Sequence, residues 1–392
     1  MAAALARWSA RLGPRQVGLL AGAAALLLVA LRLIVAADGD ITRFVVAGDT
    51  FADANAADRA GARLHVFPGD GYDGQFFWRL AVDPTDWRLD EHHGVDLDTA
   101  YRLPRIGYPA LAHLAAGGRP GLVAWSLVGV NVVAVGVVAY GGARIARHGG
   151  SPALWGLAVA SPPGLVMALG RDLAECVTVA CLVGGVAALQ ARRPVLATAA
   201  WSVAVLTREQ ALVTVAGYAA WRLVRRRPTG PGREDLPWLV PPALLVGWQV
   251  LLWHEVGRLP LASAGGTNLV APFTALVPRV AAWATGDLAR PNALAPVQLA
   301  ATVVVAVAAV RAARAVPAPD RFTVVALGLA VATATCLAAS IWRDPSDLRH
   351  LVDVGVLSWV VLLVARRPPP VWAAGVAGVV WLMTAGLRVA II

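Results

Sequence analysis

GDGYDGQFFWR, residues 69–79, lies in the only long polar segment of this chain, which covers residues 38–104. It places two carboxylates, Asp70 and Asp73, among glycines, and three aromatic residues that suit a membrane–water surface follow. Glycine lets a backbone approach a ligand closely, and a carboxylate acts as a general base or binds a cation. The stretch therefore predicts an active-site loop, although a simple turn between two helices would use the same residues.

The rest of the chain is strongly apolar. Of its 392 residues, 58% are hydrophobic and only 15% are charged, and the mean hydropathy is +0.64. This composition excludes a soluble domain and predicts an all-α polytopic membrane protein, with residues 1–392 as a single domain. The net charge of +10 comes from arginine clusters between apolar runs, which favours cytoplasmic loops over nucleic-acid binding. The three cysteines lie in apolar runs and predict no disulfide framework.

The apolar runs predict about eleven membrane-spanning helices. They cover residues 17–37, 121–140, 152–169, 173–190, 194–207, 211–224, 236–253, 293–316, 321–341, 350–366 and 371–391. Two of them, 194–207 and 211–224, are short for a bilayer of about 30 Å and could be half-helices that meet inside the protein. Residues 106–116 are apolar but contain Pro109, which predicts an amphipathic helix at the outer membrane surface.

The orientation follows from the arginines. If the N-terminus is cytoplasmic and the spans alternate, every arginine cluster falls on the cytoplasmic side, as the positive-inside rule requires. These clusters lie within residues 144–147, 192–193, 222–233, 311–321 and 366–367. Of the 24 acidic residues, 13 lie between Asp38 and Asp98. Residues 38–104 are therefore predicted to form a long first extracytoplasmic loop that carries amphipathic helices.

The same topology places a second set of polar residues on the outer face, at the ends of spans. A charge at a membrane edge is costly unless it faces a polar cavity or another charge, although charged helix ends are common. Arginine binds phosphate through two parallel N–H groups, and a carboxylate takes the proton of a hydroxyl. We expect a site for a lipid-linked phosphate sugar, with Asp73 and Asp70 as catalytic candidates. The candidates for substrate binding are Arg102, Arg105, Arg171, Asp172, Arg208, Glu209, Arg349 and His350.

Several motifs of other enzymes are missing from the sequence. There is no Walker A loop, no dinucleotide-binding glycine fingerprint and no H-E-x-x-H zinc motif. His92 and His93 are adjacent, a spacing that does not match a helical metal site, so we interpret them as part of a solvated loop. No metal ligands are predicted.

The run YDGQFF at residues 72–77, followed by AVDP at 81–84 and YRLPRIGYP at 101–109, resembles bacterial members of the GT-C fold glycosyltransferases. LTRE at residues 206–209 is similar to a recurring element of that group. The resemblance covers the first half of the chain, and the second half by topology alone. It implies a multi-pass protein of the prokaryotic inner membrane that moves a sugar from a polyprenyl-phosphate donor to an extracytoplasmic hydroxyl of a glycan, lipid or protein.

The resemblance also implies a catalytic acid in the first outer loop. Asp73 matches it best, and Asp70 and Asp49 are the rivals. Because Asp70 and Asp73 do not form an Asp-x-Asp pair, no cofactor is expected with certainty, and a divalent cation stays an alternative.

Two further classes stay open: a transporter or flippase, and a non-catalytic protein of envelope assembly. A transporter needs charged residues near the bilayer midplane and often an internal repeat. Here Arg32 is the clearest charge inside a span, and the other polar residues collect on one face. This distribution favours the enzyme.

Overall fold

The computed structural model describes residues 12–225, 232–263, 268–286, 294–343, 346–365 and 367–390. Residues 226–231 and 366, in two of the predicted cytoplasmic arginine clusters, lie outside this part. The described chain is almost all helical. Its strands are β1 (Ala47–Gly48) and β2 (Val66–Phe67), which pair in parallel within the first loop.

Almost every predicted apolar run forms one helix. The long helices are α2 (Pro14–Val35), α6 (Val123–His148), α9 (Glu175–Gln190), α10 (Pro194–Thr207), α11 (Leu212–Arg225), α12 (Leu236–Val256), α14 (Ala295–Ala312), α15 (Phe322–Thr335), α17 (Val352–Val364) and α18 (Val371–Ala390). Apolar runs thus predicted helix positions to within a few residues along most of the chain.

The run at 321–341 is divided between α15 and α16 (Ala339–Arg343). The run at 152–169 is a second exception, because it is not one straight helix. It forms α7 (Gly156–Val159) and α8 (Pro163–Gly170), and the direction of the chain changes by 67° at the break between them. Pro162 and Pro163 stand at this break. Proline has no backbone N–H and its ring clashes with the preceding turn, so a helix cannot continue through the pair.

The remaining helices are short. They are α3 (Ala54–Arg59), α4 (Gly74–Val82), α5 (Gly107–Ala116), α13 (Leu276–Ala284) and α16 (Ala339–Arg343). The 3₁₀ turns are η1 (Ile41–Phe44), η2 (Ala100–Arg102), η3 (Pro120–Leu122), η4 (Ala153–Trp155), η5 (Glu209–Ala211), η6 (Arg233–Asp235), η7 (Pro260–Ser263), η8 (Ala313–Ala315), η9 (Ala318–Asp320) and η10 (Ser346–Leu351). The helix predicted at 106–116 is α5, and it buries Tyr108 and Ala112 while Leu114 is exposed.

Five of the described helices are long and apolar enough to cross a membrane, and the bent pair α7–α8 makes six if it counts as one span. They are Pro14–Val35, Pro120–His148, Arg233–Val256, Ala295–Ala315 and Val371–Ala390. Large apolar side chains on their outer faces, such as Leu19 and Val133, are exposed. Such faces suit lipid contact. An α-helical membrane protein is therefore supported, whereas the count of eleven spans stays a prediction.

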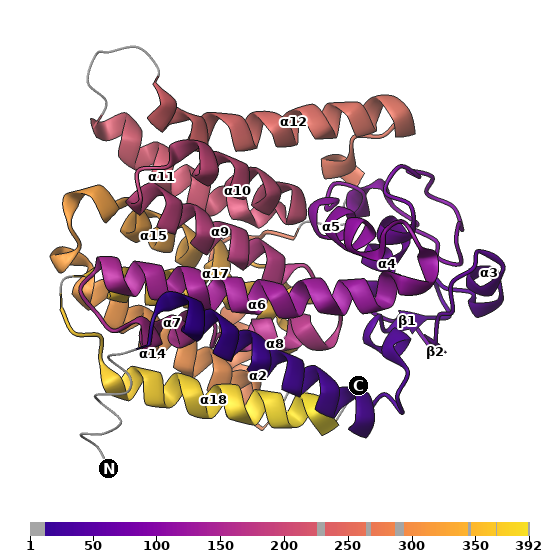
Figure 1. Cartoon of the computed structure of the whole chain (residues 1–392), viewed down its shortest axis with the longest axis horizontal. Helices are drawn as coiled ribbons and strands as arrows, with labels where there is room; N and C mark the ends of the chain where they lie inside the picture. The colour runs from indigo at the N-terminus through magenta and orange to yellow at the C-terminus, as the bar shows by residue number, and fades with distance from the viewer. Residues whose placement is uncertain are drawn as a thin grey trace.

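The long helices lie side by side, and the elements of the first loop gather at one end of them (Figure 1). Helix α6 packs against α2 and α9, and α10 packs against α9 and α12. Helix α17 is buried along its whole length, between α14, α15 and α6. A helix that is apolar all round belongs in the centre of a bundle. Because η10 leads directly into this central helix, Arg349 and His350 stand over the middle of the bundle.

Candidate active site

A buried glutamine shapes the loop around Asp73. The amide of Gln75 donates to the carbonyl of Asp70 over 2.8 Å and accepts from the backbone N–H of Gly48 over 3.0 Å. Gln75 is fully buried, so both bonds are shielded from water. This pairing holds residues 69–75 against β1 and fixes the point at which α4 begins.

Asp73 stands at the N-terminal boundary of α4, but its side chain makes no capping hydrogen bond to the helix. The carboxylate is directed instead to Arg349, whose Nη2 donates to Oδ2 of Asp73 over 2.8 Å. An ionised donor and acceptor at this distance form a strong, charge-assisted hydrogen bond. The side chain of Asp73 is still 35% exposed, so a ligand can reach it.

Two glycines allow the elements of this site to approach one another. A Cβ on Gly74 would lie 2.6 Å from the carbonyl oxygens of both Arg171 and Val45. A Cβ on Gly164 in α8 would lie 2.8 Å from the Cα of Arg349. Real Cβ atoms do not come so close to backbone atoms, so glycine is needed at both positions. The connection between α8 and α9 therefore rests against the loop that carries Asp73, and η10 rests against α8.

The three aromatic residues after Asp73 are buried in protein and do not face a membrane–water surface. Phe76, Phe77 and Trp78 are at most 6% exposed, and every residue of α4 is buried. The expectation that these aromatic residues lie at a membrane–water surface was wrong, because α4 packs against α5 and α6. The helix is a packed support for Asp73.

Glu175 connects two arginines at the centre of the site. Its Oε1 lies 3.6 Å from Nη1 of Arg349 and 3.7 Å from Nη1 of Arg208. Glu175 begins α9 and is 2% exposed, and Arg208 ends α10 and is 8% exposed. Together with Asp73 these residues form one charged group, which we call the central cluster: Asp73, Glu175, Arg208 and Arg349.

The arginines of the central cluster are not saturated. Nη2 of Arg208 donates to Oε1 of Gln210. Nη1 of Arg208 and Nε of Arg349 are buried and make no hydrogen bond among the described residues. A buried donor without an acceptor is costly, so these N–H groups are candidate contacts for an anion.

Glu209 does not pair with Arg208, its neighbour in sequence, but with Arg105. Arg105 donates to both its carboxylate oxygens, over 2.9 Å from Nη2 and 3.3 Å from Nε. Nη2 of Arg105 also donates to the hydroxyl of Tyr101 over 2.6 Å, and Asn268 donates to the same hydroxyl over 2.9 Å. Arg105 also lies close enough to the central cluster for its positive charge to lower the pKa of Asp73.

Asp70 and Arg102 lie in the same loop but serve its structure. Asp70 accepts a hydrogen bond from the Thr50 hydroxyl over 2.9 Å and is exposed. The rival Asp49 accepts from the backbone N–H of Gly69 over 2.8 Å. The guanidinium carbon of Arg102 lies 3.5 Å from the ring centroid of Phe76, and its Nη1 donates to a backbone carbonyl. Among the candidate carboxylates of this loop, Asp73 alone contacts Arg349.

Arg171 and Asp172 occupy the connection between α8 and α9. The guanidinium of Arg171 lies 4.6 Å from the ring centroid of Tyr72, and that of Arg349 lies 4.9 Å from the same ring. Tyr72 is therefore an aromatic contact for both arginines. Asp172 is fully buried, adopts the left-handed conformation with φ at 49°, and its carboxylate makes no hydrogen bond among the described residues. Among the described residues, Asp172 forms no ion pair with the central cluster.

The charges set the protonation states of the site. Burial raises the pKa of Asp73, but Arg349 and Arg105 outweigh it and lower that pKa to about 2. At neutral pH Asp73 is therefore ionised. His350 follows Arg349 in η10, and its Nδ1 is buried and makes no hydrogen bond among the described residues.

Two acidic residues were missing from the sequence-predicted site. Glu175 belongs to the outer polar set but has no motif that marks it as the bridge between two arginines. Asp353 begins the apolar helix α17, is 9% exposed, and has a buried Oδ1 without a hydrogen bond among the described residues. A lone carboxylate at the start of an apolar run was the available signal.

No family model matches this chain, and neither a curated protein nor a solved structure matches it. The geometry of its own residues is therefore the basis for a functional proposal.

Proposed function

We propose that this chain is a membrane glycosyltransferase of the GT-C type. It moves a sugar from a polyprenyl-phosphate donor to an extracytoplasmic acceptor hydroxyl, and Asp73 is the general base. The observation that carries the proposal is the central cluster, in which the accessible carboxylate of Asp73 contacts Arg349, and the buried Glu175 contacts both Arg349 and Arg208. Phosphate-binding cations and a base, placed where a lipid tail could lie between helices, are what this reaction needs.

The donor phosphate is assigned to Arg208 and Arg349. A guanidinium binds a phosphate with two parallel N–H groups, and both arginines have N–H groups without hydrogen bonds among the described residues. A negatively charged phosphate also competes with Asp73 for the guanidinium of Arg349. Donor binding thus completes the hydrogen bonding of the arginines.

The same exchange activates Asp73. A carboxylate with a pKa of about 2 is ionised but weakly basic, and a general base works best with a pKa nearer the working pH. When the phosphate draws Arg349 away, the pKa of Asp73 rises. The acceptor oxygen then attacks the anomeric carbon, its proton passes to Asp73, and the bond from that carbon to the phosphate oxygen breaks with its electron pair leaving on the polyprenyl phosphate.

The buried charges of the bundle favour this enzyme over a transporter. Arg32 lies in the last turn of α2, and its Nη1 donates to the carbonyl of Arg388, near the end of α18. Both helices end on the side of the first loop (Figure 1). These charges therefore lie near helix ends, whereas a translocation pathway needs charged groups near the middle of the membrane.

The proposed setting is the prokaryotic inner membrane, with eleven spans, a cytoplasmic N-terminus and residues 38–104 outside. In a background without native cysteines, Asp58→Cys lies in the first loop and Arg193→Cys lies before α10. We expect a membrane-impermeant maleimide to label Asp58→Cys in intact cells and to label Arg193→Cys only after lysis. Labelling of Arg193→Cys alone in intact cells would invert the topology and remove the outer site.

Arg208→Ala is expected to weaken donor binding by about 10- to 100-fold, because charge-assisted hydrogen bonds each contribute about 1.5–3 kcal/mol. Arg208→Lys should restore only part of the affinity, since lysine keeps the charge and loses the planar fork. Titration of the purified protein with a fluorescent polyprenyl-phosphate sugar measures this affinity. Arg222→Lys is the matched control, because Arg222 pairs with Glu234 and Asp235 away from the site. Unchanged affinity in Arg208→Ala would exclude this role.

The function itself is tested by a transfer assay. The purified protein in lipid nanodiscs is incubated with a panel of polyprenyl-phosphate sugars, each labelled in the sugar, and with a membrane extract as acceptor. We expect label to move from the donor into a new product for at least one sugar. Absence of a product with every sugar, from protein that still binds the donor, would contradict the proposal.

A further inference from the structure

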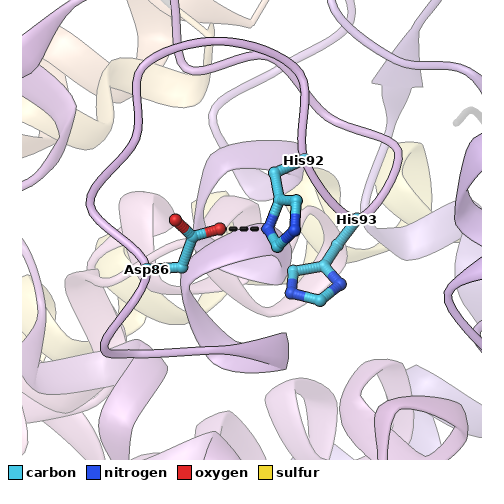
Figure 2. Close-up of side chains that lie close together, drawn as sticks. All are labelled: Asp86, His92 and His93. Carbon is cyan, nitrogen blue, oxygen red and sulfur yellow. Dashed lines mark ion pairs between the residues drawn. The ribbon is translucent and has the colours of Figure 1, made fainter.

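A second polar group lies in the first loop, away from the central cluster. Figure 2 shows Asp86, from the segment after α4, beside His92 and His93. Each of the three residues offers one potential metal-ligand atom, and these atoms all lie within 4.8 Å of one another. The Asp86 side chain is 7% exposed and that of His92 is 32% exposed. The group is thus built into the loop.

The fold of the loop explains how two adjacent histidines come to one side. The backbones of His92 and Val95 exchange two hydrogen bonds, over 3.3 and 3.2 Å, so the chain reverses between them. His93 adopts φ of 52° and Gly94 φ of 85°, both in the left-handed region. The two imidazole ring centroids therefore lie only 3.9 Å apart. Helical spacing, on which the sequence interpretation depended, does not apply to such a turn.

Arg79 fixes the frame around this group. Its guanidinium is 1% exposed and donates to the backbone carbonyls of Asp90, Val95 and Arg88, over 2.6, 2.8 and 2.8 Å. It also lies 3.4 Å from Asp86. Because one guanidinium binds three carbonyls, Arg79 holds both arms of the loop in place. The fold of the loop therefore brings Asp86, His92 and His93 together.

The nitrogen atoms that face the group have unused binding capacity. Nε2 of His93 is buried and makes no hydrogen bond among the described residues. Nδ1 of His92 directly faces Oδ2 of Asp86. Zinc in proteins takes imidazole nitrogen and carboxylate oxygen at about 2.0–2.2 Å, usually in a tetrahedron. Ligand atoms within 4.8 Å of one another can reach that geometry after small side-chain movements.

We propose that Asp86, His92 and His93 bind a divalent transition-metal cation of the zinc class. Two imidazoles and one carboxylate leave a fourth position for water or another ligand. Asp86 also lines a cavity of about 750 Å³, together with Asp90, Asp96, Asp98 and Glu255. Arg88 and Arg258 also line this cavity, but the carboxylates outnumber the arginines, so the cavity attracts cations towards Asp86. The bound cation would tie the segment after α4 to the turn at His92, and this role does not depend on the proposed transfer reaction.

A hydrogen-bonded arrangement without metal is the competing state. Nη2 of Arg88 lies 2.6 Å from Nε2 of His92, and Nε of Arg88 donates to Asp86 over 2.9 Å. In that state Nε2 of His92 accepts from Arg88, and Nδ1 of His92 pairs with the carboxylate of Asp86. Arg88 is 60% exposed, so it can move aside when a cation takes Nδ1 and the proton resides on Nε2. Metal binding would favour the state in which Arg88 has moved away from His92.

The test uses the full chain purified in detergent through a tag without histidine, and stripped of metal with a chelator. Zinc chloride is titrated against a chromophoric chelator that competes for the ion. We expect one zinc ion per chain and a higher unfolding temperature when zinc is added. The His92→Gln and His93→Gln variants should each bind zinc at least about tenfold more weakly, because a ligand is lost. With cobalt as probe, only the intact group should give the visible absorption of a tetrahedral site.

His254→Gln is the matched control, since His254 is 83% exposed at the end of α12 and should leave zinc binding unchanged. The double variant His92→Gln/His93→Gln separates a specific site from surface binding. Wild-type protein that binds no zinc, or a double variant that is folded and binds zinc as tightly as wild type, would overturn the proposal. In either case the role of the group is limited to the contacts of Asp86 with Arg88 and His92.

Discussion

Replacing Asp73 by asparagine is expected to slow sugar transfer by about 10²- to 10⁴-fold, the usual contribution of general-base catalysis. The amide keeps the size of the side chain and can still accept from Arg349, but it cannot take a proton from the acceptor hydroxyl. Donor affinity should be unchanged or tighter, because Arg349 no longer has a carboxylate that competes with the phosphate. Single-turnover transfer and donor titration on the same preparation separate the two effects.

Asp70→Asn is the matched control for this experiment. Asp70 lies three residues away and accepts a single side-chain hydrogen bond from Thr50, and it forms no ion pair with the central cluster among the described residues. Its replacement should change the transfer rate by much less than that of Asp73. If Asp73→Asn turns over at a near-normal rate, or if Asp70→Asn loses more, the base must be assigned to another carboxylate, Asp70 first and then Asp49.

Replacing Arg349 by alanine is expected to have the widest effect, because one guanidinium contacts Asp73, Glu175 and Tyr72. Donor affinity should fall by about 100-fold, since a bidentate contact of charged groups is lost. Removing one partner of a fully buried ion pair costs about 3–5 kcal/mol. Asp73 is 35% exposed, so we expect a smaller loss, about 1–3 kcal/mol in the free energy of unfolding. Arg349→Lys should recover part of the stability.

The pH dependence of stability checks the same pair. The pKa of Asp73 is lowered in the folded protein from 3.8 to about 2, so the ionised pair stabilises the fold fully above about pH 4. This contribution is lost as the pH falls from about 4 towards 2, where the folded carboxylate is protonated. The Arg349→Ala variant should lose much of this acid-sensitive term when thermal unfolding is followed across that range. Equal acid sensitivity in both proteins would show that other groups carry it.

The sequence predicted the scaffold well because a helix that faces lipid or a bundle core is apolar on most of its surface, so a continuous apolar run marks its position. Helix α10 has the predicted bounds of the 194–207 run, and most others agree to within a few residues. The Pro162–Pro163 pair in the 152–169 run was visible in the sequence, and its effect is local, so the break between α7 and α8 could have been predicted from it.

The partners within the site could not be predicted in the same way. Arg208 and Glu209 are neighbours in sequence, yet they bind Glu175 and Arg105 from other connections. Backbone geometry at the end of α10 turns successive side chains in different directions, and only the packing of α9 and the first loop decides what each meets. The proposed metal site is a similar case. The turn at His93 and Gly94 brings His92 to Asp86, and the sequence pattern did not reveal this turn.

A glycosyltransferase separates the sugar from its lipid carrier, and a donor labelled in both parts reveals whether this protein does so. Sealed proteoliposomes receive a polyprenyl-phosphate sugar with one isotope in the sugar and a second in the lipid, together with the acceptor extract. We expect the sugar label to move to a new product while the lipid label stays in polyprenyl phosphate, and we expect Asp73→Asn to suppress this separation. If the two labels stay together and cross the bilayer as one molecule, at the same rate in Asp73→Asn, the protein is a flippase and not a glycosyltransferase.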